Sequence, residues 1–238
     1  MSASFSKLTN TSLKEQAIRE LEKSFLSGDF KPGDRLPPER ELAAAMGISR
    51  SLINLCILEL EHRGFVRIVP RHGTFVTDFK KQGTPQILLS LMNYDADKMD
   101  WTLFDNMMDM RLLLECECTR LAMENASEEI LLQMHEALSA MELSQNIESF
   151  VDGNFSFHHA LTAASGNAVY AMIFSSFETA IRLFLKSFFT SSERRSESAR
   201  MHRALLNAIR SRDETAALDA IRQALGTGIA GLSEIFKQ

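Results

Sequence analysis

The sequence has few cysteines and no long apolar run. Cys56 stands alone, and Cys116 and Cys118 lie two residues apart on a predicted helix, where their side chains diverge. We therefore expect reduced thiols rather than a disulfide framework. The apolar runs are too short to cross a bilayer, and the N-terminus MSASFSKLTN lacks the apolar stretch of a signal peptide. A cytoplasmic protein without a membrane partner is expected.

An excess of positive charge is also absent, because the net formal charge is −5. The charge is uneven along the chain. Residues 1–81 hold 13 Lys and Arg against 10 Asp and Glu, whereas residues 82–238 hold 13 against 21. This asymmetry favours contact with a polyanion at the N-terminal part only. The 238 residues, 45% of them hydrophobic, can form two domains with real cores.

Three helices and a hairpin are predicted within residues 1–78. Ser12 and Glu15 have capping-box spacing ahead of a first helix that ends at Gly28. A second helix begins at the prolines of LPPERELAAAMG, and a third runs from the N-cap Ser49 to Gly64. The runs FVRIV and TFVT flank PRHG and predict a β-hairpin. This order is typical of a winged helix-turn-helix domain.

The third helix has two distinct sides when about 100° is allowed per residue. The inner side carries Ile53, Cys56 and Leu60, and the outer side carries Arg50, Ser51 and Asn54. Arginine can bind guanine and asparagine can bind adenine in the major groove, so the outer side is suited to reading DNA. Solvated surface charges are the alternative. They are less favoured because Arg40, Arg50 and Arg71 fall on the three elements that a winged helix uses to contact DNA.

The strings PGDRLPPERELAAAMGISRS and LELEHRGFVRIVPRHGTFV resemble the DNA-binding domain of GntR-family transcription regulators, over residues 12–78. Geometry and this resemblance together predict the DNA contacts, with Arg71 and His72 at the hairpin tip. The family commonly has arginine where this chain has Asn54, which leaves the operator sequence open. The predicted contact residues are Arg40, Ser49, Arg50, Ser51, Asn54, Arg71, His72 and Gly73.

Residues 79–100 are predicted to form a linker with a docking helix in PQILLSLMN, and residues 101–238 an all-α bundle. The fold class is therefore mainly α. Helical periodicity extends through the bundle with almost no strand signal. The predicted helices span residues 101–126, 127–144, 149–166, 167–190, 191–212 and 213–237.

Three motifs in the bundle, MRLLLE, FHHALTAASGN and MHRALLNAIRSRDETAA, resemble the FCD effector domain of the FadR subgroup. The resemblance implies a central cavity that binds a small organic acid, often beside a divalent metal, and couples this binding to DNA affinity. The family's metal ligands are an aspartate, a histidine four residues later and two further histidines. This chain matches them with Asn154, His158, His202 and Ala224. Asp152 lies about 240° around the helix from His158 and cannot replace the aspartate.

Asn154, His158 and His202 are therefore candidate ligands for at most a weak divalent ion, completed by water or by an effector carboxylate. Otherwise they recognise the effector directly, together with Arg111. Arg111 lies one helical turn before Glu115, and it either pairs with that carboxylate or binds a ligand carboxylate. A bulkier fatty acyl ligand is an alternative, because FETAIRLFLKSFF offers several aromatic side chains.

These features predict a ligand-responsive transcription regulator, most simply a repressor, that binds a palindromic DNA operator as a homodimer. A metal-dependent enzyme is a less favoured alternative, because the sequence has no nucleophile elbow, phosphate-binding glycine loop or HExxH pair. A purely architectural DNA-binding protein would not explain a helical domain twice the size of the DNA-binding part. We therefore expect no enzymatic activity.

Overall fold

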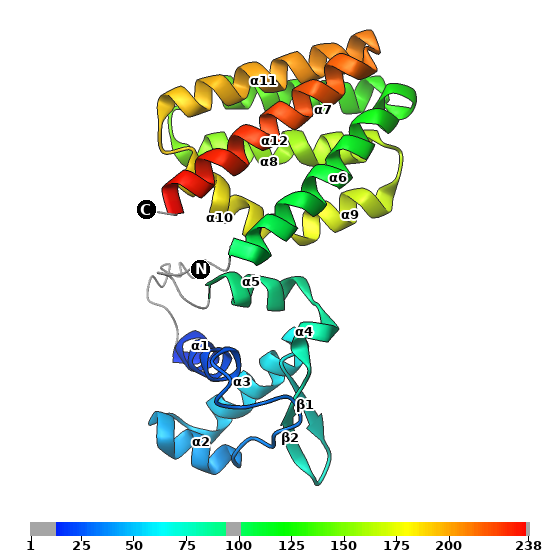
Figure 1. Cartoon of the computed structure of the whole chain (residues 1–238). Helices are drawn as coiled ribbons and strands as arrows, with labels where there is room; N and C mark the ends of the chain where they lie inside the picture. Colours follow the sequence, from blue (N-terminus) through cyan, green and yellow to red (C-terminus); the bar gives the residue numbers. More distant parts are fainter. Residues whose placement is uncertain (1–12, 94–100, 237–238) are drawn as a thin grey trace, which may run out of the picture. The chain divides into compact units, whose positions relative to one another are not determined.

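The structure is a computed structural model that describes residues 13–93 and 101–236. The described residues form two compact units that divide at residue 100 (Figure 1). Each unit is described by itself. No single described helix is long and apolar enough to cross a membrane, and two helix pairs reach that length and composition only when joined across bends of 110° and 61°.

The N-terminal unit contains the predicted three helices and β-hairpin, so the winged helix-turn-helix is confirmed. Ser12 of the predicted capping box lies outside the described residues. Two further helices, one of them a single turn, follow the hairpin. The elements are α1 (Leu13–Leu26), α2 (Glu39–Met46), α3 (Arg50–Arg63), β1 (Val66–Val69), β2 (Gly73–Val76), α4 (Phe79–Gln82) and α5 (Pro85–Asn93).

Local signals fix both ends of α3. The Ser49 side chain accepts a hydrogen bond from the Leu52 backbone N–H, and Gly64 ends the helix at a φ of 93°. Ile53, Cys56 and Leu60 are fully buried, as their spacing predicts. They pack with Ile18, Phe25 and Phe65 in the core of the unit. Burial of this side holds the opposite side of α3 toward solvent.

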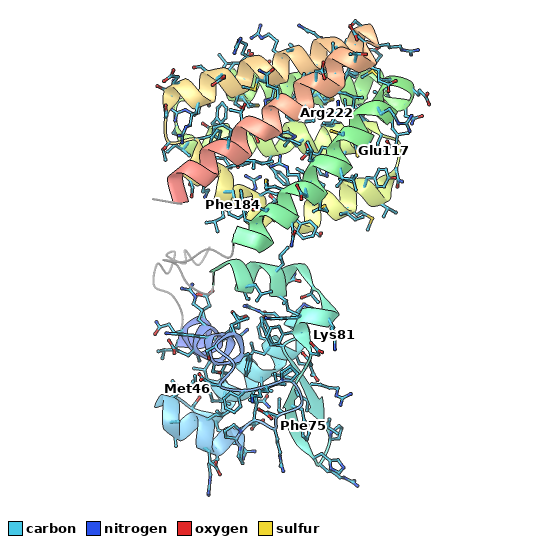
Figure 2. All side chains as sticks on the ribbon, in the orientation of Figure 1. Met46, Phe75, Lys81, Glu117, Phe184 and Arg222 are labelled. Atoms are coloured by element: carbon cyan, nitrogen blue, oxygen red, sulfur yellow. The ribbon has the colours of Figure 1, made fainter. Side chains whose placement is uncertain are left out.

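The β-hairpin has an antiparallel register from Val66 opposite Val76 to Val69 opposite Gly73. Gly73 has a φ of 115°, and a Cβ atom placed there would lie 2.7 Å from Nε of Arg35. Arg35 also forms a β-bridge with Phe75, which is labelled on the hairpin in Figure 2. Glycine is favoured at position 73 by this backbone conformation, and its lack of a side chain leaves room for the Arg35 guanidinium.

The C-terminal unit is all-α, as predicted. Its central helix is α8, which packs against most of the other helices of the unit (Figure 1). A Cβ atom at Gly153 would lie 3.0 Å from the Ala137 carbonyl oxygen, so the small glycine lets α8 pack closely on α7. The helices are α6 (Trp101–Asn125), α7 (Glu128–Glu142), α8 (Ile147–Ala164), α9 (Ala168–Ser176), α10 (Glu178–Phe188), α11 (Ser192–Ser211) and α12 (Glu214–Phe236).

The single helix predicted over residues 167–190 is wrong. The chain bends by 61° between α9 and α10. Phe177 at the bend has φ −99° and ψ 7°, outside the α-helical region, and the Ser176 hydroxyl donates to the Ile173 carbonyl oxygen. A serine hydroxyl that hydrogen-bonds to its own helix backbone favours such a break. The apolar periodicity continues across the bend, which explains why the sequence pattern does not reveal it.

Candidate functional site

Seven of the eight predicted DNA-contact residues are exposed, and they lie on α2, on or immediately before α3, and at the hairpin tip. The eighth, Gly73 at the start of β2, is half-buried. Arg40 lies on α2, while Arg50, Ser51 and Asn54 share the solvent side of α3. In Figure 1, α2 and the hairpin tip both reach the lower end of this unit. The structure thus places these side chains on the three expected elements. Their contact with DNA stays a prediction.

Glu39 connects two of these side chains. Its Oε2 accepts a hydrogen bond from Nε of Arg50 at 3.1 Å, and its Oε1 accepts one from Nδ2 of Asn54 at 3.0 Å. The hydrogen bonds from Asn54 and from Arg50 lower the pKa of Glu39. Because a carboxylate only accepts, Nδ2 of Asn54 must face it, and the amide oxygen is left to accept a hydrogen bond from another group.

The hairpin tip presents Arg71 and His72 to solvent. The His72 backbone N–H donates to the Val69 carbonyl oxygen at 3.0 Å, which closes a turn that has Pro70 in its second position. Arg71 occupies the third position at a φ of 67°, where glycine or asparagine is usual. A non-glycine residue in this region is uncommon and costs backbone energy, a pattern that is enriched at binding sites.

A cavity of about 50 Å³ lies in the C-terminal unit, and all four predicted effector-binding residues line it. Arg111 comes from α6, Asn154 and His158 from α8, and His202 from α11. All four are at least 90% buried. The rest of the lining is mostly apolar and aromatic, and Ala224 lines the same cavity. Sequence positions more than 100 residues apart are thus brought together at one site.

Glu115 links Arg111 to His158 inside the unit. Its carboxylate accepts a hydrogen bond from Nε of Arg111 at 2.5 Å and a second hydrogen bond from Nδ1 of His158. Burial would raise the pKa of Glu115, but the positive charge of Arg111 and the hydrogen bonds outweigh it and hold the pKa at about 2. Glu115 is therefore ionised, and Nδ1 of His158 carries the hydrogen that it donates.

His202 is oriented by the backbone of its own helix. Its Nδ1 lies 2.7 Å from the Ser198 carbonyl oxygen, which can only accept, so Nδ1 carries the hydrogen. Burial lowers the pKa of His202 to about 3, and burial also lowers the pKa of His158 against the opposing effect of Glu115. Both rings are therefore neutral near neutral pH, and each has a lone pair on Nε2.

These tautomers leave an excess of hydrogen-bond acceptors at one end of the cavity. Nε2 of His158 lies 3.0 Å from Nε2 of His202, with no hydrogen for either to donate. The Asn154 amide nitrogen donates to Nε2 of His202 at 3.3 Å, and its oxygen has no partner among the described residues. We call these three atoms, the two Nε2 nitrogens and the Asn154 oxygen, the acceptor corner.

The residues of the acceptor corner do not fit a resident divalent metal ion. Among residues 13–93 and 101–236, no group of three or more His, Cys, Asp or Glu side chains is arranged to hold one. An amide stands where the family has a carboxylate, and Ala224 offers no ligand at the fourth position. Glu115 bonds to Nδ1 of His158, the ring nitrogen opposite Nε2, and therefore does not supply a ligand atom on the cavity side.

Sequence reasoning missed three contributions to these sites. It treated Glu115 only as a partner of Arg111, and it gave no role to Glu39 or Ser198. Glu39 stands immediately before Arg40 in the quoted motif, and Ser198 lies four residues before His202, a spacing that places its carbonyl oxygen near that side chain. The contact between Glu115 and His158 joins residues 43 positions apart, and no local spacing signals it.

Each of the two units matches the model of a known protein family. Residues 13–76 match the family model described as bacterial regulatory proteins, gntR family, and residues 106–227 match the FCD domain model. The fatty acid metabolism regulator protein of Shewanella sp. strain MR-7 is 26% identical over 192 residues, which cover 79% of this chain and 77% of that protein. The HTH-type transcriptional regulator Mce2R of Mycobacterium tuberculosis is 23% identical over 218 residues, covering 92% and 90%.

Solved structures have the same fold. The structure of Lar, whose title says that it controls the expression of the Listeria monocytogenes agr system, matches with a TM-score of 0.67 at 16% identity and covers 95% of this chain and 99% of that one. E. coli McbR/YncC matches with a TM-score of 0.54 at 20% identity, covering 94% and 99%. The matched families and named relatives are transcription regulators, not enzymes.

Proposed function

The chain belongs to the gntR family of bacterial regulatory proteins and carries an FCD domain, and from this premise we propose that it is a cytoplasmic repressor. In this proposal a homodimer holds two winged helices on a palindromic operator. A small metabolite enters the cavity of the FCD unit and changes operator affinity. The cavity, with its surplus of acceptors, is the observation that supports effector binding most strongly.

On the operator, we propose that α3 lies in the major groove with Arg50 and Asn54 directed at base edges. Glu39 positions both side chains before DNA binds. Arg40, Arg71 and His72 reach the flanking phosphates or minor groove, while Ser49, Ser51 and Gly73 bring the backbone close to the DNA. Nδ2 of Asn54 is held by Glu39, and the exposed amide oxygen then favours a base that presents a hydrogen-bond donor, such as adenine or cytosine.

In the cavity, we propose that the effector is a small organic acid that also carries a hydrogen-bond donor such as a hydroxyl group. The donor approaches the acceptor corner, where a buried acceptor without a partner costs about 1–3 kcal/mol. The effector carboxylate binds the terminal nitrogens of Arg111, whose Nε is already held by Glu115. The cavity volume of about 50 Å³ favours a small molecule.

A fatty acyl ligand is the second candidate. It is favoured by the aromatic lining of Phe184, Phe188 and Phe189 and by the names of the Shewanella relatives. A long acyl chain would require α10 and α12 to separate, because ligand pockets for molecules of that size typically exceed 300 Å³. The acceptor corner would also remain without a donor, which makes this candidate weaker than a hydroxy acid.

Matched ligand pairs test the proposal for the effector. Binding of lactate against propionate, and of malate against succinate, is measured by calorimetry with the full-length protein. Each pair differs by one hydroxyl group, so the hydroxy acid should bind roughly 10- to 100-fold more tightly if it satisfies the acceptor corner. Equal binding within a pair would contradict a donor at the corner. Tight binding of an acyl thioester but of neither acid would favour the second candidate.

Selection of operator DNA from random duplexes tests the other half of the proposal. The selected sites should contain two inverted half-sites. A two-fold symmetric dimer places its two α3 helices on two copies of the same half-site sequence that run in opposite directions. A single unrepeated site would contradict the palindromic operator. An effect of ligand on affinity for the selected DNA would then define the direction of control.

A further inference from the structure

The outer face of the β-hairpin carries positive charge that the predicted DNA contacts do not include. Arg67 on β1 lies directly opposite Phe75 on β2. Arg35, in the segment before α2, forms a β-bridge with the same Phe75, which is labelled in Figure 2. Side chains that lie directly opposite each other on neighbouring strands point to the same face. Arg35, Phe75 and Arg67 therefore form one row across the hairpin, with the aromatic ring in the middle.

This row faces solvent. The residue that adjoins each member along the chain is buried in the core of the unit, namely Leu36, Val66 and Val76. Because successive side chains of a strand point to opposite faces, the row lies on the face away from the core. Arg35 and Arg67 are accordingly exposed, and Phe75 is half-buried. Neighbouring strands lie about 4.8 Å apart, so the backbones of the two arginines are about 10 Å apart.

Arg35 also lies close to the hairpin tip. A Cβ atom at Gly73 would lie 2.7 Å from Nε of Arg35 and 3.2 Å from one of its terminal nitrogens, so the guanidinium lies against the backbone of Gly73. Gly73 directly follows Arg71 and His72, the exposed residues of the tip. The charge of Arg35 is thus held beside the residues that are expected to reach DNA. We call Arg35, Arg67 and Arg71 the hairpin arginines.

The hairpin arginines have no acidic partner. Among residues 13–93, none of their side chains forms an ion pair or a hydrogen bond. Other basic side chains of the unit do pair with carboxylates, namely Lys14, Arg50, Arg63 and Lys81. The carboxylate of Asp34, next to Arg35, accepts a hydrogen bond from the Lys31 backbone N–H. One unpaired arginine is ordinary on a protein surface, but three on one hairpin create a positive potential that suits a polyanion.

We propose that Arg35 and Arg67 bind phosphates of the operator beside the groove that the hairpin tip enters, an inference that rests on the proposed operator binding. It extends the DNA interface beyond the eight predicted contact residues. Each DNA strand carries one charge per about 3.4 Å of axis, so arginines about 10 Å apart contact separate phosphates. Such contacts add affinity and fix the orientation of the hairpin without reading the base sequence.

The dependence of operator affinity on salt concentration tests this assignment. Loss of one phosphate contact lowers the slope of log affinity against log salt by about 0.9, and a contact of this kind contributes roughly 5-fold to affinity at about 0.15 M salt. Arg35→Gln and Arg67→Gln should each show this loss for each bound subunit, and the double variant should show about twice the loss in slope. Fluorescence anisotropy with the full-length protein and the selected operator measures both quantities between about 50 and 200 mM salt.

Three controls separate phosphate contacts from other effects. Arg19→Gln removes an exposed arginine of α1, in a cleft that no hairpin residue lines, and should keep the wild-type slope. Arg35→Lys keeps the charge and should retain most of the affinity, because lysine also binds phosphate. A base-pair change within the half-site should weaken the wild type and the variants by the same factor. Thermal melting should give wild-type midpoints for all of these variants.

The outcomes distinguish this inference from the proposed function. A wild-type salt slope in the double variant, with operator binding intact, would overturn the phosphate contacts alone. An equal loss of slope in Arg19→Gln, or a base preference that changes with either substitution, would also overturn them. If Arg35→Lys binds as weakly as Arg35→Gln, Arg35 acts through its packing on Gly73 and not through its charge, which would overturn its phosphate contact. Absence of sequence-specific DNA binding by the wild type would overturn the proposed function and this inference together.

Discussion

Acidification should destabilise the C-terminal unit through His202. This side chain is 2% exposed, and burial lowers its pKa from 6.5 to about 3. Because the folded-state pKa is depressed, the unfolded chain takes up the proton first as the pH falls. The stability contribution is therefore complete above about pH 6.5 and is lost progressively as the pH falls toward about 3.

The size of the effect follows from the two pKa values. At about pH 5 the unfolded histidine is protonated and the folded one is still neutral. This pH lies about 1.5 units below the unfolded-state pKa of 6.5. At about 1.4 kcal/mol per unit, folding loses about 2 kcal/mol relative to neutral pH. His202→Gln removes the titrating ring. On acidification from neutral pH to about pH 5, the wild type should therefore lose about 2 kcal/mol more unfolding free energy than this variant.

Urea unfolding followed by helical circular dichroism measures this difference at both pH values. The wild type and His202→Gln are compared with His135→Gln, which alters an exposed histidine on α7 of the same unit. The His135 variant should follow the wild type, because its ring is not buried. If the stability of His202→Gln has the same pH dependence as that of the wild type, His202 is not held neutral. Nε2 of His202 would then not be the free acceptor that the acceptor corner requires.

Three further predictions concern the charge network, the DNA-reading helix and the metal ligands. Glu115→Ala leaves Arg111 buried without its partner. It should lower the free energy of unfolding by about 3–5 kcal/mol in urea titrations. An unchanged midpoint would contradict the charge network. Arg50→Ala should weaken operator binding by roughly 10- to 100-fold in fluorescence anisotropy without lowering the melting temperature, whereas loss of both would indicate misfolding. The double variant Asn154→Asp, Ala224→His should bind Zn²⁺ stoichiometrically in calorimetry, whereas the wild type should bind it weakly. Tight binding of Zn²⁺ by the wild type would contradict the incomplete donor set.

The parts of the fold that follow from local chemistry can be predicted from the sequence. The ends of α3 depend on Ser49 and Gly64, which act within one turn, and its buried side depends on a simple spacing of apolar residues. The same reasoning predicts the hairpin and most helices of the bundle. It fails at Phe177, because the apolar pattern persists on both sides of a bend that only the backbone conformation and the Ser176 hydrogen bond reveal.

The candidate site is predictable in its membership but not in its hydrogen bonding. The resemblance to the FCD domain selects Asn154, His158 and His202, and the structure places all three around one cavity. The tautomer of each ring depends on an acceptor that lies on another helix or on the backbone, namely Glu115 for His158 and the Ser198 carbonyl oxygen for His202. The acceptor corner therefore emerges only from the packed structure.

Effector control through the cavity is tested by measuring operator affinity during titration with the hydroxy acid that binds best, in the wild type and in His158→Ala. If the cavity controls DNA binding, the ligand should change wild-type operator affinity by about 10-fold or more, within the usual range of allosteric coupling. The His158 variant should bind the operator as tightly as the wild type in the absence of ligand and should respond to it weakly. An equal ligand response in both proteins, or none in either, would contradict effector control through this cavity.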